Sequence, residues 1–119
     1  GVDDAGVGAI AGPIFAAAVL LPPDSDCIGI VDSKTLSLKR RRVAFETVCA
    51  TPGLVWATAA VRAREVDILG GHAATAGAMR LAVARLEAKL MRAQARAHLG
   101  PAPPLSRPAY CLVDGPTLP

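Results

Sequence analysis

Residues 1–21 read GVDDAGVGAIAGPIFAAAVLL and contain two apolar segments separated by glycines. The first segment, residues 1–4, is short and is followed by Gly6 and Gly8, which favour a turn. The second, Ile14–Leu21, carries strand-forming residues and is stopped by two prolines, so at this length it favours a strand over a helix. Two strands joined through a glycine-rich bend predict a β-hairpin at the start of the chain.

The rest of the sequence predicts two main helices and two more strands. Leu38–Ala50 predicts an amphipathic helix, with Ser37 as its N-cap. Leu54–Val61 and Ala109–Val113 predict a third and a fourth strand. Between them, 73–99 has apolar residues at every third or fourth position, which predicts the longest helix. Its core-facing stripe is predicted to be Met79, Val83, Leu86, Leu90, Ala93 and Ala97. This order of elements is typical of an α/β domain with a mixed sheet.

The composition is that of a chain that can bury one core. Its 119 residues are about one domain's worth, and the hydrophobic fraction of 52% with 19% charged residues excludes disorder for most of the chain. The longest apolar run has about half the length of a membrane-spanning helix, so no membrane span is expected. The two Phe, one Trp and one Tyr are too few for extended stacking platforms on single-stranded nucleic acid.

The cysteines and histidines show no metal-binding spacing. Cys27, Cys49 and Cys111 are far apart and form no Cys-x-x-Cys pair. We expect them to be buried or half-buried free thiols in a reducing compartment, which favours the cytoplasm, or the nucleus or an organelle in a eukaryote. His72 and His98 lack ligand-spaced partners and are expected at the surface or at helix ends.

The net charge of +3 is mild, but the basic residues are grouped. One cluster is Lys39–Arg42, and the other comprises Arg85, Lys89, Arg92 and Arg96. Such clusters are most often solvated helix faces, and they are also compatible with an anionic partner.

Acidic residues lie where two of the predicted strands end. Asp3 and Asp4 end the first strand and Asp114 the fourth, each followed closely by glycine. If these strands are neighbours, at the usual spacing of about 4.8 Å, the three carboxylates come within reach of one cation. Carboxylate clusters hold Mg²⁺ for phosphoryl transfer. Against this, adjacent strand residues point to opposite faces, and Asp–Gly pairs are ordinary turn formers.

A competing motif overlaps the first bend. Residues 6–11 fit the pattern G-x-G-x-x-A of a dinucleotide-binding turn, with Asp26 as the acidic residue further on. That turn must open a helix whose N-terminus receives the pyrophosphate, whereas Gly12, Pro13 and an apolar run follow here. Nucleotide binding is therefore the weaker hypothesis.

Taken together, the segments resemble ribonuclease HII, the type 2 ribonuclease H family, in its bacterial form. The opening GVDDAGVG at residues 1–8 is similar to the family pattern G-[IV]-D-E-A-G-R-G, and DSKTLS at 32–37 is similar to D-S-K-x-L-S. TAGAMRLAV at 75–83 fits T-x-x-A-M-x-x-A-V, and LVDGPTLP at 112–119 fits L-V-D-G-x-x-L-P. The match follows the family order along the whole chain.

The resemblance implies an RNase H-like fold, an α/β domain with a mixed sheet and flanking helices. Residues 1–119 are then one partial domain, cut at both ends and lacking its C-terminal part. The implied activity is that of an endonuclease that cuts the RNA strand of RNA–DNA hybrids, or cuts at ribonucleotides embedded in duplex DNA. Its implied cofactor is Mg²⁺ or Mn²⁺, its partner is that nucleic acid, and a monomer without membrane contact is expected. The alternative is a nucleic-acid-binding homologue that has lost catalysis.

The resemblance also assigns roles to particular residues. The catalytic metal ligands would be Asp3, Asp4 and Asp114. The substrate-binding residues would be Gly6, Val7, Gly8, Ser33 and Lys34. The glycine amides would face the ribonucleotide, whose 2′-OH distinguishes RNA from DNA. Ser33 and Lys34 would lie near the DNA or the scissile backbone, and the basic helix faces would hold phosphates.

Two departures from the family pattern concern the predicted site, and a third, Gly70–Ala73 in place of an apolar and amide run, should loosen the entry to the long helix. Asp4 stands where the family has Glu, and the missing methylene withdraws the carboxylate by about 1.5 Å, against a tolerance of about 0.2 Å in metal–ligand distances. Val7 replaces an Arg, so a charged contact to the substrate is lost while the glycine amides remain. A fourth family carboxylate is expected beyond residue 119, so the 119-residue piece is not expected to act alone.

Overall fold

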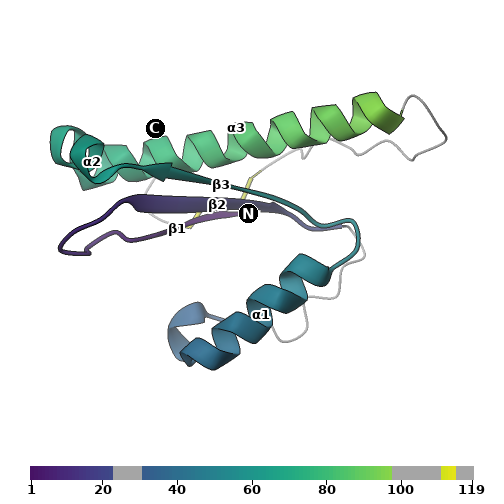
Figure 1. The fold of residues 1–119 in the computed structure, drawn as a ribbon, viewed down its shortest axis with the longest axis horizontal. Helices are drawn as coiled ribbons and strands as arrows, with labels where there is room; N and C mark the ends of the chain where they lie inside the picture. Colours follow the sequence, from purple (N-terminus) through teal and green to yellow (C-terminus); the bar gives the residue numbers. More distant parts are fainter. Residues whose placement is uncertain (23–30, 98–110, 115–119) are drawn as a thin grey trace. The chain divides into compact units, whose positions relative to one another are not determined.

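The computed structural model describes residues 1–22, 31–97 and 111–114. The chain forms two compact units, Gly1–Leu20 with Val55–Pro119, here the sheet unit, and Leu21–Leu54, here the α1 unit. The sheet unit contains β1 (Val2–Ala5), β2 (Ile14–Leu20), β3 (Val55–Val61), α2 (Ala63–Leu69) and α3 (Gly71–Ala97) (Figure 1). The α1 unit contains the short 3₁₀ helix η1 (Ser33–Thr35) and α1 (Leu38–Ala50).

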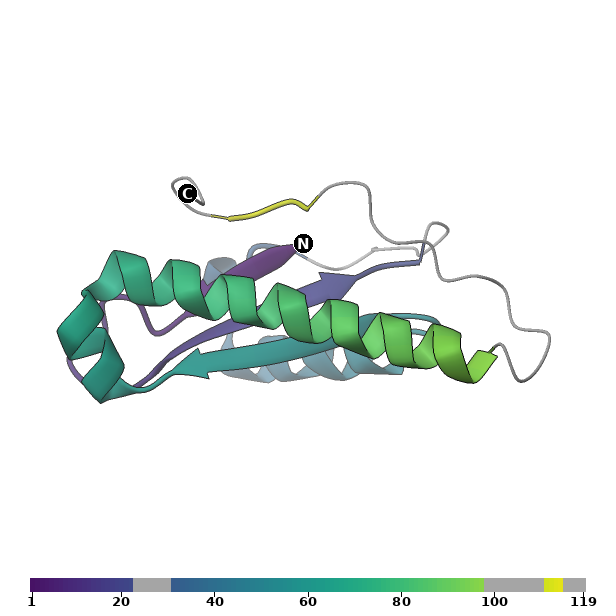
Figure 2. The same cartoon turned by 90° about the horizontal axis from the view of Figure 1, so that it is seen from above.

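The sheet has β2 at its centre, between β1 and β3. Both pairings are antiparallel, so the predicted hairpin at the start of the chain is confirmed. On the other side of β1, Val113 forms a parallel bridge with Val2. Figure 2 shows the short segment that contains Val113 on the side of β1 away from β3, with α3 crossing one face of the sheet. The predicted α/β class with a flanking helix is therefore confirmed, and the described sheet is antiparallel with one parallel bridge beside it. Of the predicted fourth strand, Val113 forms this bridge, while residues 109 and 110 lie outside the described part.

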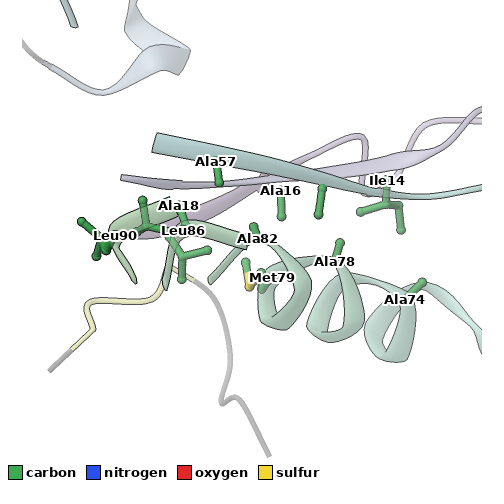
Figure 3. Packing of buried hydrophobic residues seen from close by; sticks show 12 residues of the cluster. Ile14, Ala16, Ala18, Ala57, Ala74, Ala78, Met79, Ala82, Leu86 and Leu90 are labelled. Carbon is green, nitrogen blue, oxygen red and sulfur yellow. The ribbon is translucent and has the colours of Figure 1, made fainter. Parts of the chain in front are cut away.

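One face of the sheet packs against α3, and most of the residues buried there are alanines (Figure 3). Along β2 the burial alternates, since Ile14, Ala16 and Ala18 are buried while Phe15 and Ala17 are exposed. This alternation is typical of a strand that is covered on one face. The buried core consists of Val2, Ile14, Ala16, Ala18, Ala57, Ala59, Ala74, Ala78, Met79, Ala82, Leu86 and Leu90. Alanine leaves room for the helix to lie close to the sheet.

The predicted stripe of α3 is largely confirmed. Met79, Leu86 and Leu90 are buried, and Val83 packs against them partly buried. Ala93 is exposed, and the side chain of Ala97 lies outside the described part. The structure adds three core alanines at positions 74, 78 and 82, which are all fully buried. Alanine is found on buried and exposed helix faces alike, so residue spacing alone does not show which alanines of α3 are buried.

A short helix that the sequence pattern does not predict precedes α3. The backbone N–H of Arg62 donates to Glu65 Oε2 at 2.9 Å, which satisfies a donor at the start of α2. Gly70 then ends α2 with a φ of 79°, a left-handed conformation that glycine adopts without strain. The chain turns there and α3 begins at the next residue, two residues earlier than predicted.

The α1 unit confirms the predicted helix at the same bounds. Ser37 is its N-cap, and Ser37 Oγ accepts a hydrogen bond from the backbone N–H of Arg40 at 3.4 Å. Ala44 and Val48 are half-buried, one turn apart on the helix, whereas Val43 is exposed.

Two of the three cysteines lie in the described part of the chain, and both are free thiols. Cys49 and Cys111 are exposed, so the prediction that they are buried or half-buried was wrong. Cys49 lies in the last turn of α1, next to the half-buried Val48 but not on its side of the helix. Cys27 and His98 lie outside the described residues, while His72 is exposed in the first turn of α3, as predicted.

Among the described residues, no helix combines the length and the apolar character needed to cross a bilayer.

Candidate active site

Two of the predicted carboxylates lie on neighbouring segments, Asp3 in β1 and Asp114 in the 111–114 segment that is bridged to β1. The backbone N–H of Val2 donates to the Leu112 carbonyl at 2.8 Å, and the N–H of Asp114 donates to the Val2 carbonyl at 3.1 Å. These bonds flank the parallel bridge between Val2 and Val113. The next residue on each strand is an aspartate, Asp3 on one and Asp114 on the other. The strand adjacency on which the predicted site depends is thus present.

Asp3 and Asp114 also share a face of the sheet. Val2 is buried, and Val113 packs partly buried against the same core, so both valines point toward α3. Because successive strand residues point to opposite faces, Asp3 and Asp114 lie on the face away from α3. Both aspartates are exposed. This face is therefore open to a ligand at both positions.

Asp4 is placed differently. It is still within β1, opposite the buried Ala16, and it is half-buried. Strand alternation puts it on the face toward α3, opposite to Asp3. Its backbone N–H donates to Asp3 Oδ1 at 2.7 Å, which orients the Asp3 carboxylate. Across residues 1–22, 31–97 and 111–114 the structure assembles no group of three or more His, Cys, Asp or Glu side chains able to hold a metal.

The donor chemistry of the Asp3–Asp114 pair fits a hard divalent cation. Carboxylate oxygens are the ligands that Mg²⁺ prefers, and two exposed carboxylates on adjacent strands repel each other unless a cation lies between them. The pair supplies protein ligands from two strands and leaves the remaining coordination positions to water or phosphate oxygens, as is usual for Mg²⁺.

The loop after β1 contains three of the predicted substrate-binding residues. Gly6 has a φ of 104°, and a Cβ on it would lie 2.9 Å from the carbonyl oxygen of Pro13. Glycine is therefore required there both by conformation and by the close approach of the chain. Gly8 has a φ of 83°, but a Cβ on it would have no atom within 4 Å. Val7, between them, is 55% exposed, so this loop presents backbone and an apolar side chain to solvent.

The other two predicted substrate-binding residues, Ser33 and Lys34, lie in η1 of the α1 unit. Asp32 caps this short helix, because Asp32 Oδ1 accepts from the backbone N–H of Lys34 at 2.9 Å. Ser33 and Lys34 are both exposed. The Asp of the DSK segment thus fixes the turn and leaves the next two side chains open to solvent.

The basic residues fall into two kinds. Lys39–Arg42 of α1 are all exposed, as expected for a solvated helix face. On α3, Arg85 Nη1 donates to the Thr58 carbonyl at 2.8 Å and Lys89 Nζ donates to the Trp56 carbonyl at 2.7 Å. The head groups of Arg85 and Lys89 are therefore bound to β3, a role that the spacing of basic residues in the sequence does not indicate.

A sequence model of the ribonuclease HII family matches residues 1–98. The chain belongs to the ribonuclease HII family. The matched part includes β1, its glycine loop and the DSK segment. Asp114 lies beyond residue 98, so its place in the site rests on the pairing of its strand with β1.

Named relatives agree with this assignment. The ribonuclease HII of Frankia casuarinae is 39% identical over 117 residues, covering 97% of this chain and 41% of that protein. That of Paracidovorax citrulli is 41% identical over 118 residues, 99% of this chain and 48% of that protein. That of Dechloromonas aromatica is 44% identical over 89 residues, 75% of this chain and 45% of that protein. The chain thus spans less than half the length of each of these ribonucleases HII.

Proposed function

We propose that this ribonuclease HII family chain is part of an endonuclease that hydrolyses the RNA strand of RNA–DNA hybrids or cuts at ribonucleotides embedded in duplex DNA. The activity is metal-assisted, with Mg²⁺ or Mn²⁺ as cofactor. Family membership supports the reaction class. The observation that carries the site is the parallel pairing of Val2 with Val113, because it sets Asp3 beside Asp114 on one exposed face.

The electrostatics of the substrate explain why the carboxylates and a cation belong together. A phosphodiester is an anion, and two exposed aspartates alone would repel it. Asp3 and Asp114 would hold a divalent cation, which would supply the positive charge that activates water and stabilises the leaving oxygen. The Asp4 N–H keeps Asp3 Oδ1 in place.

Asp4 is the third ligand of the proposal, and its position makes it the weakest of the three. Its side chain starts from the opposite face of β1 and is one methylene shorter than the Glu of the family pattern. In the proposed enzyme Asp4 therefore supports the site less strongly than Asp3 and Asp114. The same observation favours the second candidate function, a family member that binds its nucleic acid but has lost catalysis.

Substrate recognition is assigned to the backbone of the β1–β2 loop and to the DSK segment. The Gly6 and Gly8 amides contact the ribonucleotide near its 2′-OH, the group that separates RNA from DNA. Ser33 and Lys34 contact the phosphate backbone, and the exposed Lys39–Arg42 cluster adds salt-dependent attraction. Val7 offers no charge, so affinity in this loop depends on the glycine amides alone.

The proposed function is tested by nicking of a duplex that carries one ribonucleotide, in the presence of Mg²⁺ or Mn²⁺. In the intact protein that contains this chain, the wild-type site should nick at the ribonucleotide, and Asp3→Asn should abolish the reaction. Asp67→Asn removes an exposed carboxylate in α2, outside the site, and should leave nicking unchanged. Nicking that persists in Asp3→Asn would remove Asp3 from the site. Binding of the duplex that is unaffected by a chelator, without nicking, would favour the candidate that has lost catalysis.

A further inference from the structure

The strand β3 forms an edge of the described sheet. It pairs with β2 along its whole length, and no described residue pairs with its other side. An edge strand presents unpaired N–H and C=O groups that another chain can join by strand addition. β3 reads VWATAAV and contains neither a charged residue nor a proline. Nothing within the strand itself therefore opposes such pairing.

Hydrogen bonds elsewhere in the sheet show which carbonyls of β3 point outward. Val19 of β2 exchanges both of its backbone hydrogen bonds with Gly1, so its N–H and C=O point toward the β1 side. Val19 is the register partner of Trp56, which means that the Trp56 backbone groups point away from β2. By the two-residue period of a strand, the same holds for Thr58.

These outward carbonyls are the ones that α3 covers. Arg85 binds the Thr58 carbonyl and Lys89 binds the Trp56 carbonyl. Residues four apart on a helix are about 6 Å apart along its axis, and residues two apart on a strand are about 6.7 Å apart, so the two spacings match. The Lys89 Nζ also lies 4.7 Å from the centre of the Trp56 ring, a cation–π contact that holds the lysine over the strand.

We propose that Arg85 and Lys89 are an edge guard that prevents β3 from pairing with the β3 of a second copy of this chain. A second copy is the occupant that the edge fits, because two identical edge strands can pair antiparallel about a two-fold axis. The guard acts by occupying the acceptors and by placing two positive charges at the edge, where Arg85 and Lys89 from α3 of the other copy would add two more. This assigns to Arg85 and Lys89 a role distinct from contact with the nucleic acid.

The test compares two double variants of the full chain. Arg85→Gln with Lys89→Gln removes the guard, while Arg92→Gln with Arg96→Gln removes the same charge from exposed positions further along α3. Mass is measured by light scattering or sedimentation over rising protein concentration, with far-UV circular dichroism to confirm the fold. The guard variant should form dimers or larger species, and the control should stay monomeric. A folded guard variant that remains monomeric, or equal association of both, would overturn the proposal.

A third substitution locates the contact. Thr58→Pro removes an N–H that points away from β2, so it costs no bond within the sheet and blocks strand addition at that point. Added to the guard variant, it should restore the monomer, and association that persists would show that the edge of β3 is not the interface. If the guard variant lacks the native spectrum, Arg85→Gln and Lys89→Gln are measured singly. Monomeric, folded single variants would then overturn the proposal.

Discussion

The two sides of the sheet use charged side chains in opposite ways. Beside β1, the 111–114 segment bonds the outward N–H and C=O of Val2, and the acidic Asp3 and Asp114 are left exposed to solvent. Beside β3, no described strand completes the pairing, and the basic Arg85 and Lys89 bind the backbone instead. In this sheet, the charged residues beside the paired strand are free to bind a ligand. Those beside the edge strand bind its backbone and so have a structural role.

The largest expected effect is on the nicking rate, and it distinguishes the β1 side of the sheet from the β3 side. Asp114→Asn should lower the nicking rate by about 100-fold or more, since it removes a charged cation ligand that acts as a unit with Asp3. Arg85→Gln, on the β3 side, should change the rate by less than about threefold because its head group binds Thr58. Single-turnover rates at saturating Mg²⁺ measure both. Similar losses of nicking rate in Asp114→Asn and Arg85→Gln would contradict the assignment of catalysis to the β1 side of the sheet alone.

The next largest effect is expected on stability, from substitutions in the glycine loop that follows β1. Gly6→Ala should destabilise the sheet unit by about 1–3 kcal/mol, because the strain of its positive φ is joined by a clash with the Pro13 carbonyl. Gly8→Ala carries the conformational strain without the clash, so its cost should be closer to about 1 kcal/mol. Urea unfolding of both variants measures the difference. Equal costs would mean that the close approach at Gly6 relaxes freely.

A smaller effect is expected on the metal affinity of the acidic residues beside β1. Asp4→Glu restores the side-chain length of the family pattern and should tighten Mn²⁺ binding by up to about tenfold, with a rise in nicking. Titration calorimetry gives the affinity, and Asp67→Glu is the control for an added methylene on an exposed carboxylate. An unchanged or weaker affinity would indicate that the shorter side chain is already accommodated.

The smallest effect is expected on stability, from loss of the Lys89 contacts beside β3. Lys89→Gln should destabilise the sheet unit by about 0.5–1 kcal/mol, since it loses one exposed hydrogen bond and the cation–π contact. Trp56 is the single tryptophan, so its fluorescence reports directly on this contact. Its emission should change in Lys89→Gln and remain as in the wild type in Arg92→Gln. An emission unchanged by Lys89→Gln would place the lysine away from the ring in solution.

Much of the fold could be predicted because local signals agree with the final structure. The glycine bend and double proline define β1 and β2, and Ser37 begins α1 at the predicted residue. The adjacency of Asp3 and Asp114 could only be stated as a condition, because pairing between distant strands depends on the whole chain. The bridge of Val2 with Val113 meets that condition.

Other features could not be predicted because they arise from packing. α2 is too short to show a helical period, and its end depends on the left-handed Gly70. The roles of Arg85 and Lys89 depend on α3 lying beside β3 in one register, which residue spacing alone does not give. The side of the sheet on which Asp4 lies could not be predicted either. It depends on where β1 ends, and β1 continues to Ala5 instead of ending at the two aspartates.

The central claim is that Asp3 and Asp114 bind one cation together, and paramagnetic Mn²⁺ tests it most directly. In the isotope-labelled chain, substoichiometric Mn²⁺ should broaden the amide resonances of both aspartates at the same concentration, while that of Asp67 stays sharp. Asp3→Asn should abolish the broadening at Asp114 as well. Broadening at one aspartate without the other, or unchanged broadening at Asp114 in the variant, would contradict the account.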